Sequence, residues 1–224
     1  MKDVWLKIAC TGAVAAACLI PASLSNVSSV NAQSGDSRVQ IGFAAAPVPL
    51  NMKGKNPALV GLGSYYVNVV GDCNGCHSAG PPTEFLPGGN PYFNQKKMVN
   101  TATYLGGGRD FGFLGPPTAS AGAHIISRNL TPDASGLPEG GNSFEQFVTI
   151  IRTGADPDHR HPTCGTTINS GCVPAPFDGN LLQVMPWPAL QDLSDNDLRA
   201  IYEYLGAVPC IQGNDAYEPA NRCG

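Results

Sequence analysis

Three stretches of the chain space their apolar residues as an amphipathic helix does, three or four positions apart. They cover about residues 57–76, 144–152 and 195–205. The apolar positions are Leu59, Leu62, Tyr66, Val69 and Val70 in the first stretch, Phe144, Phe147, Val148 and Ile151 in the second, and Leu198, Ile201, Tyr202 and Leu205 in the third. The pattern therefore predicts three core helices.

The first and third predicted helices should cross, because each has an apolar face and no other long helix is predicted that would bury it. The expected contact residues are Tyr65 or Tyr66 and Val69 in the first helix, and Tyr202 and Leu205 in the third.

Capping signals mark the ends of the second and third helices. Ser143 and Gln146 form a capping box before the second helix, and Gly154 stops that helix. Ser194 is the expected N-cap of the third helix, which Gly206 ends.

The segment between the first two helices, residues 78–141, contains 12 Gly and 8 Pro. Such a composition alone would suggest disorder. The same segment carries many large apolar side chains, including Phe85, Tyr104 and Ile125. We therefore expect an ordered loop that wraps an apolar cofactor, with room for a short hairpin. Residues 33–56 show no clear period and are expected to form a flexible leader.

The first 32 residues have the features of an export signal. Lys2 and Lys7 precede an apolar run, and small residues follow it up to Ala32. This pattern predicts a signal peptide over residues 1–32 and a periplasmic, water-soluble mature protein. Lipid attachment at Cys18 is an alternative. Pro21 interrupts the apolar run before it reaches membrane-spanning length, which disfavours a retained anchor.

The chain is acidic, with a formal net charge of −4. Removal of residues 1–32, which contain Lys2, Lys7 and Asp3, would change that charge to −5. No stretch rich in Lys and Arg is present to displace phosphate counterions, so the composition argues against a nucleic-acid partner.

The candidate chemistry lies at the end of the first predicted helix, in the sequence Cys73-Asn74-Gly75-Cys76-His77. Two cysteines separated by two residues and followed by histidine form the pattern of covalent c-type haem attachment. The two thiols would bond to the haem vinyl groups, and His77 would ligate the iron. The sequence therefore predicts one haem c.

Two other chemistries use a Cys-x2-Cys pair. A structural zinc site would need a second ligand pair at matching spacing, and the chain contains none. A thioredoxin-like redox pair would need a βαβ context, whereas the residues before Cys73 are predicted to be helical.

The second axial position of the iron needs another ligand. The candidates after cleavage are Met52, Met98, Met185, His124, His159 and His161. Met185 is favoured, because Pro186 excludes it from helix and lets its thioether project across a loop. The alternative for Met185 is a core gap-filler. Met98, His159 and His161 are expected at the surface, and His124 as a loop histidine with its own partner.

The two haem propionates would need charge-assisted hydrogen-bond donors. Arg109, Arg128, Asn129 and Arg152 are the candidates, because they lie in the Gly-rich segment and beside the second helix.

Four further cysteines remain after cleavage, namely Cys164, Cys172, Cys210 and Cys223. In an exported chain they are expected to form two disulfides. Three pairings are possible, and the simplest joins Cys164 to Cys172 and Cys210 to Cys223. We expect the first to clamp the loop before Met185 and the second to tether a tail over residues 210–224.

The order helix, Cys-x2-Cys-His, long loop, Met and helix resembles a class I c-type cytochrome. Further motifs resemble bacterial periplasmic cytochromes related to the cytochrome subunits of membrane-associated alcohol and aldehyde dehydrogenases. These motifs are residues 66–71 (YVNVVG), 129–133 (NLTPD), 151–154 (IRTG) and 185–188 (MPWP). The resemblance covers about residues 57–206 and implies an all-α cytochrome c fold over residues 57–209, with three core helices around one haem.

A haem iron bound by His77 and Met185 has no open position, so the predicted function is one-electron transfer between redox proteins, such as a periplasmic dehydrogenase or an oxidase of a respiratory chain. The rivals are a haem enzyme, either peroxidase-like or oxidising inorganic sulfur, and a gas sensor. A peroxidase of this kind resembles a two-haem protein, a sulfur enzyme would need a cysteine or a labile ligand at the iron, and a sensor would need a five-coordinate iron.

Overall fold

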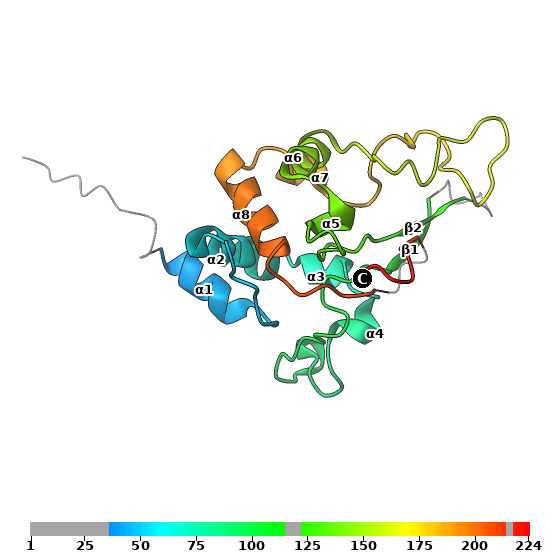
Figure 1. The fold of residues 1–224 in the computed structure, drawn as a ribbon. Coiled ribbons are helices and arrows are strands. Elements are labelled where there is room, and N and C mark those ends of the chain that lie inside the picture. The colour runs from blue at the N-terminus through cyan, green and yellow to red at the C-terminus, as the bar shows by residue number, and fades with distance from the viewer. Residues whose placement is uncertain (1–35, 115–121, 214–216) are drawn as a thin grey trace, which may run out of the picture. The chain divides into compact units, whose positions relative to one another are not determined.

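The computed structural model describes residues 36–114, 122–213 and 217–224 (Figure 1). The predicted signal peptide and Cys18 lie outside the described residues. The elements are α1 (Ser37–Ala45), α2 (Pro57–Tyr65), the π turn η1 (Tyr66–Val70), α3 (Cys73–Cys76), α4 (Pro81–Glu84), the 3-10 turn η2 (Pro91–Phe93), β1 (Asp110–Phe113), β2 (His124–Ile126), α5 (Pro138–Gly141), α6 (Phe144–Thr153), α7 (Trp187–Leu190) and α8 (Asp195–Leu205).

The second and third predicted helices are confirmed as α6 and α8. The Ser143 hydroxyl accepts from the backbone N–H of Gln146 at 3.3 Å, and the Ser143 N–H donates to the Gln146 side chain at 2.8 Å. Gly154 ends α6 with a φ of 70°, a left-handed conformation that glycine adopts without strain. The Ser194 hydroxyl caps α8 by accepting from the N–H of Asp197.

The first predicted helix is not continuous. After α2 the chain widens into a π turn, in which the N–H of Gly71 donates to the carbonyl of Tyr66 at 2.8 Å. Asp72 then adopts a left-handed conformation with a φ of 43°, and α3 begins at Cys73. A π turn breaks the 3.6-residue period and occurs frequently at functional sites.

The buried face of this helix also differs from the prediction. Val60 and Val67 are 0% and 1% exposed, whereas Val69 and Val70 are 46% and 61% exposed. The predicted face assumed one unbroken period, and the π turn from Tyr66 onward shifts the later residues around the axis.

Helices α2 and α8 cross, as expected, and Figure 1 shows them side by side. The two helices approach closely at Gly63, where an added Cβ would be 1.9 Å from the carbonyl oxygen of Ala200. The expected contact through Val69 is wrong, because this residue is exposed. Tyr202 instead packs its ring on Phe144 and Phe147 of α6, at centroid distances of 5.4 and 5.6 Å.

Residues 37–45 form a helix, where a flexible leader was expected. Helix α1 packs on α2 through small residues, and the Ser64 hydroxyl donates to the carbonyl of Gly42 at 2.6 Å. A Cβ on Gly42 would lie 1.9 Å from the carbonyl oxygen of Gly61. Helices that pack through glycines need no regular spacing of large apolar residues, so the hydrophobic pattern did not predict this helix.

The Gly- and Pro-rich segment is ordered in its described parts, as expected. Tyr104 and Leu105 are buried in the main core beside α8 residues such as Leu198 and Tyr204. Strands β1 and β2 form a two-stranded antiparallel sheet, which matches the expected short hairpin and adds a strand component to the all-α prediction. No helix in the described part of the chain is long and apolar enough to cross a membrane.

Candidate functional site

A cavity of about 450 Å³ lies between the Cys-x2-Cys-His segment, helices α6 and α8, and the loop before α7. This volume is in the range of ligand pockets, about 300–1,000 Å³. Its walls are mostly apolar and include Val67, Phe147, Leu198 and Leu205. The cavity therefore suits a large apolar ligand held by a few polar groups.

Five of the predicted site residues meet at this cavity. They are Cys73, Cys76, His77, Arg128 and Met185. His77 and Met185 lie 108 positions apart in the sequence, and the fold brings both to the wall of the same cavity.

His77 is held in a defined orientation by the segment after β2. Its Nδ1 lies 2.7 Å from the backbone carbonyl oxygen of Arg128. A carbonyl oxygen can only accept, so Nδ1 carries the proton and Nε2 keeps its lone pair. Burial lowers the pKa of His77 and favours the neutral ring. This tautomer is the one that a metal ligand requires, and the carbonyl supplies the orienting partner.

The two motif cysteines stand at the ends of the single turn α3. Both are free thiols. Burial raises the pKa of the Cys73 thiol to about 12, which suppresses the thiolate that disulfide exchange would need. Within the described ranges, no group of three or more His, Cys, Asp or Glu side chains could hold a metal ion.

Met185 lies in the loop before α7, as the sequence predicted, and packs its half-buried side chain on the main core. The end of α6 anchors this loop. The N–H of Leu182 donates to the carbonyl of Gly154 at 2.7 Å, and Trp187 covers Gly154 so closely that a Cβ there would lie 2.2 Å from its ring. Val184 has a φ of 68°, a strained conformation for a β-branched residue, directly before Met185.

The other candidate axial ligands lie in different places, and Met52 packs on the main core without lining the cavity. His124 is exposed and its Nδ1 lies 2.8 Å from Asp110, which confirms that it has its own partner, although it begins strand β2 and does not lie in a loop. Met98, at 38% exposed, and His159 are surface residues, as expected. The surface placement of His161 is wrong. Its ring lines the cavity, and its buried Nδ1 has no hydrogen-bond partner in the described residues.

Among the four predicted propionate partners, only Arg128 lines the cavity. Its guanidinium is ion-paired with Asp156 and, at 3.3 Å, with Asp158. Arg109 instead donates to the carbonyl of Gly75 within the motif, and its guanidinium lies 4.8 Å from the centroid of the Phe111 ring. Arg109 therefore supports α3 from outside the cavity.

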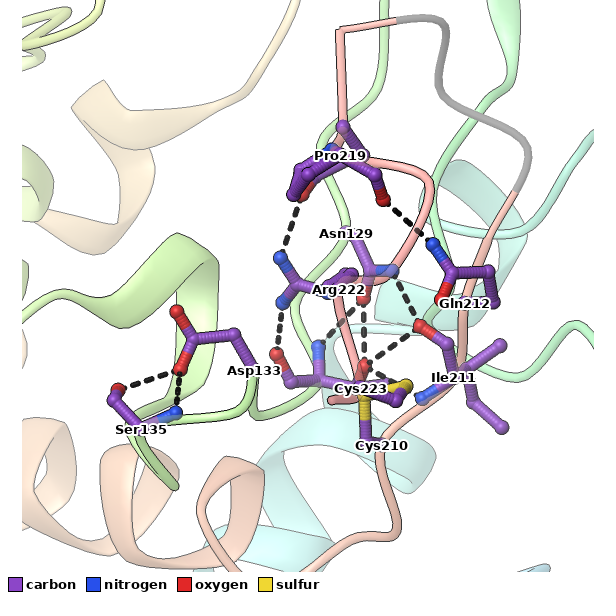
Figure 2. The surroundings of a disulfide bond; sticks show 11 residues. Asn129, Asp133, Ser135, Cys210, Ile211, Gln212, Pro219, Arg222 and Cys223 are labelled. Carbon is purple, nitrogen blue, oxygen red and sulfur yellow. Dashed lines mark hydrogen bonds and ion pairs between the residues drawn. A yellow bond between two sulfur atoms is a disulfide. The ribbon is translucent and has the colours of Figure 1, made fainter.

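Asn129 and Arg152 serve other contacts. The Asn129 amide donates to the carbonyl of Ile211 at 2.8 Å, which holds the chain tail (Figure 2). Arg152 donates to the carbonyl of Gln191 and, at 2.8 Å, to Asp195, which joins α6 to the start of α8. Neither residue lines the cavity.

Sequence reasoning missed several polar residues of the cavity wall, among them Glu139, Arg160 and Tyr217, and it placed His161 at the surface. His161 and Tyr217 pack edge to face at 5.7 Å, and the Arg160 guanidinium lies 4.8 Å from the centroid of the Tyr217 ring. The only signal in the sequence was the cluster Arg160-His161, because Glu139 and Tyr217 carry no local pattern.

Both predicted disulfide pairings are confirmed. Cys164–Cys172 closes the loop before Val173, a buried residue of the cavity wall. Cys210–Cys223 holds the tail, and next to it Arg222 donates to the carbonyl of Thr131 (Figure 2). The tail also supplies Tyr217 to the cavity wall, so the second disulfide helps to hold part of the site.

The chain is similar to the gluconate 2-dehydrogenase cytochrome c subunit of Pantoea cypripedii, with 28% identity over 162 residues. The match covers 71% of this chain but only 26% of that protein, so the chain corresponds to about a quarter of its relative. No protein-family profile and no solved structure matches the chain. This distant similarity supports a cytochrome c related to those of dehydrogenase complexes, with haem c as the implied cofactor.

Proposed function

We propose that this chain is a periplasmic one-electron carrier with a class I cytochrome c fold. One haem c would be attached through Cys73 and Cys76, with His77 and Met185 as the axial ligands. The observation that carries the proposal is the hydrogen bond from His77 Nδ1 to the Arg128 carbonyl, because it leaves Nε2 free at a cavity that Met185 also lines.

The residues of the cavity fit such a group. The walls are apolar, two thiols stand three positions apart on one turn, and buried polar atoms of Glu139 and His161 have no partner in the described residues. Arg128 and Arg160 line the same wall, and each is ion-paired with acidic side chains.

A haem with nitrogen and sulfur axial ligands supplies one-electron exchange between Fe(II) and Fe(III). His77 and Met185 would fill both axial positions, and this favours a carrier over an enzyme that binds substrate at the metal. The four remaining cysteines are paired with one another, so none of them is available as an iron ligand for a sulfur-oxidising enzyme.

The partner we propose is a dehydrogenase or another redox protein of the periplasm. The relative from Pantoea cypripedii is named as the cytochrome c subunit of a dehydrogenase, and this chain would serve a similar enzyme through a small, transient interface.

Absorption spectroscopy of the oxidised protein tests the axial ligands. Met185→Ala should abolish the weak sulfur-to-iron charge-transfer band in the far red, lower the reduction potential and let the ferrous protein bind carbon monoxide. Met98→Ala is the matched control, because Met98 lies at the surface, and should leave all three properties unchanged. A Met185→Ala protein that keeps the band and binds no carbon monoxide would contradict the assignment.

Covalent attachment is tested separately by mass spectrometry of the denatured chain. The mass of one haem should remain on the wild-type polypeptide. Cys73→Ser and Cys76→Ser should each weaken or abolish this retention, whereas retention in the double variant would overturn the motif's role.

A further inference from the structure

Glu139 is a buried carboxyl group in the wall of the cavity. It is 7% exposed, and its Oε2 has no hydrogen-bond partner among the described residues. The backbone holds it there in a left-handed conformation, with a φ of 52°, between Pro138 and two glycines. A buried and unpaired carboxylate is costly, so this group favours its neutral form.

Arg128, whose charge acts on Glu139, is already ion-paired with other carboxylates. Arg128 lowers the pKa of Glu139 by its charge, but its guanidinium is ion-paired with Asp156 and Asp158. Burial dominates over Arg128 and raises the pKa of Glu139 to about 7, with a further upward contribution from Asp158. The carboxyl group therefore changes protonation near neutral pH.

Other ionisable groups face the same cavity or interact with Glu139. They are Tyr66, Asp72, His77, Arg128, Asp156, Arg160, His161 and Tyr217 on the cavity wall, with Asp158, which is ion-paired with Arg128, and Tyr202 on α8. Burial lowers the pKa of His161 and raises that of Tyr202, so near neutral pH both favour their uncharged forms.

We propose that Glu139 takes up a proton when the protein is reduced, so that electron transfer is coupled to proton binding at this carboxyl group. This inference rests on the proposed haem at the same cavity. One electron arrives from a one-electron donor, such as the redox partner, and one proton arrives from water to convert the Glu139 carboxylate to the carboxylic acid. On oxidation the electron and the proton leave again.

The direction of the coupling follows from charge. An added electron makes the cavity more negative, so Glu139 binds its proton more tightly in the reduced state. Equivalently, a protonated Glu139 makes reduction easier, and the reduction potential falls as the pH rises through neutrality. If reduction tightens proton binding tenfold, the potentials of the two limiting forms differ by 59 mV for a one-electron couple.

The test measures the midpoint potential of the haem-loaded protein as a function of pH. The wild type should show a decrease between two plateaus around neutral pH. Glu139→Gln should lose this decrease and keep a potential near that of the wild type at low pH. Glu145→Gln is the control, because Glu145 is an exposed carboxylate on the adjacent helix α6 and should leave the curve unchanged.

Infrared difference spectra between the oxidised and reduced states give a second readout that does not depend on the potential. With carbon-13-labelled glutamate, reduction near neutral pH should produce a label-sensitive carboxylic-acid band, which should be absent in Glu139→Gln. Glu139→Asp should keep a pH-dependent potential with a displaced midpoint.

The outcomes separate the two proposals. A protein that binds no haem or lacks the methionine band overturns the proposed function. A haem-loaded protein whose potential does not change with pH, or whose pH dependence persists in Glu139→Gln, overturns the role of Glu139 alone and assigns any remaining titration to the haem propionates or His161. Absence of the labelled band in the wild type also overturns the role of Glu139.

Discussion

Replacement of Gly63 by alanine should destabilise the protein, although alanine is the better helix former. An added Cβ would lie 1.9 Å from the carbonyl oxygen of Ala200, 2.5 Å from its carbonyl carbon and 2.8 Å from Cβ of Tyr204. Two of these three atoms belong to the α8 backbone, so no side-chain rotation can relieve the contact. The two helices would have to move apart.

The size of the effect follows from this geometry. A carbon atom normally stays about 3.3 Å from a carbonyl oxygen, so the shortest contact of 1.9 Å would have to lengthen by more than 1 Å. Overpacking of this kind typically costs about 1–3 kcal/mol. The better helix propensity of alanine returns about 1 kcal/mol. Because the displaced helix also carries Tyr204 and Leu205 of the core, we expect an overpacking cost at the upper end of this range, about 3 kcal/mol. After the gain in helix propensity, the free energy of unfolding should fall by about 2 kcal/mol.

Denaturant-induced unfolding followed by circular dichroism measures this loss on the full chain. For a chain of this size, a loss of about 2 kcal/mol lowers the melting temperature by about 4–8 °C. Gly165→Ala is the matched control, because Gly165 is exposed and an added Cβ would meet no atom within 4 Å. Its stability should stay within about 0.5 kcal/mol of the wild type.

An unchanged or increased stability of Gly63→Ala would refute this reasoning. If Gly63→Ala were as stable as the wild type or more stable, helix propensity alone would explain it, and the close crossing of α2 and α8 would be wrong. The crossing matters for the site, since α8 supplies Leu198 and Leu205 to the wall of the cavity that the motif also lines.

Local signals in the sequence were sufficient for several features of the fold. The capping box at Ser143 and the periodic apolar residues that follow located α6, and Ser194 located the start of α8. The Cys-x2-Cys-His motif and Met185 were found from spacing and from one proline, and the structure brings all of them to one cavity. These features depend on residues close together in the chain, which is why a sequence can specify them.

Long-range contacts account for what the sequence did not reveal. The π turn at residues 66–70 and the left-handed Asp72 break the first helix with no proline at the break, and the single glycine there, Gly71, did not predict it. Arg152 and Asn129 looked like ligand donors because of their charge or polarity and their position, yet tertiary contacts commit them to α8 and to the tail. Glu139 reaches the cavity only through the packing of α5, which no periodic pattern announces.

Three further predictions follow from contacts around the site. Replacement of Cys164 and Cys172 by serine removes a disulfide between residues 8 positions apart and should lower the free energy of unfolding by about 2.5 kcal/mol. Denaturation of the wild type and the variant, with and without reductant, measures this loss. Tyr104→Phe removes a hydroxyl that lies 2.5 Å from Asn68 Oδ1 and 2.7 Å from the Tyr204 hydroxyl, and should lower the free energy of unfolding by about 1–3 kcal/mol in the same assay. An unchanged free energy of unfolding would show that these buried hydrogen bonds do not contribute to stability. Finally, Glu139 should make stability depend on pH. Its pKa rises from 4.5 in the unfolded chain to about 7 in the folded protein, so its contribution is most favourable below pH 4.5 and is lost as the pH rises through about 7. The shift corresponds to about 3 kcal/mol, and the difference in unfolding free energy between the wild type and Glu139→Gln should change by about that amount across this range. A difference that stays constant with pH would show that Glu139 ionises in the folded protein as it does in water, because only a group whose proton affinity changes on folding can couple stability to pH.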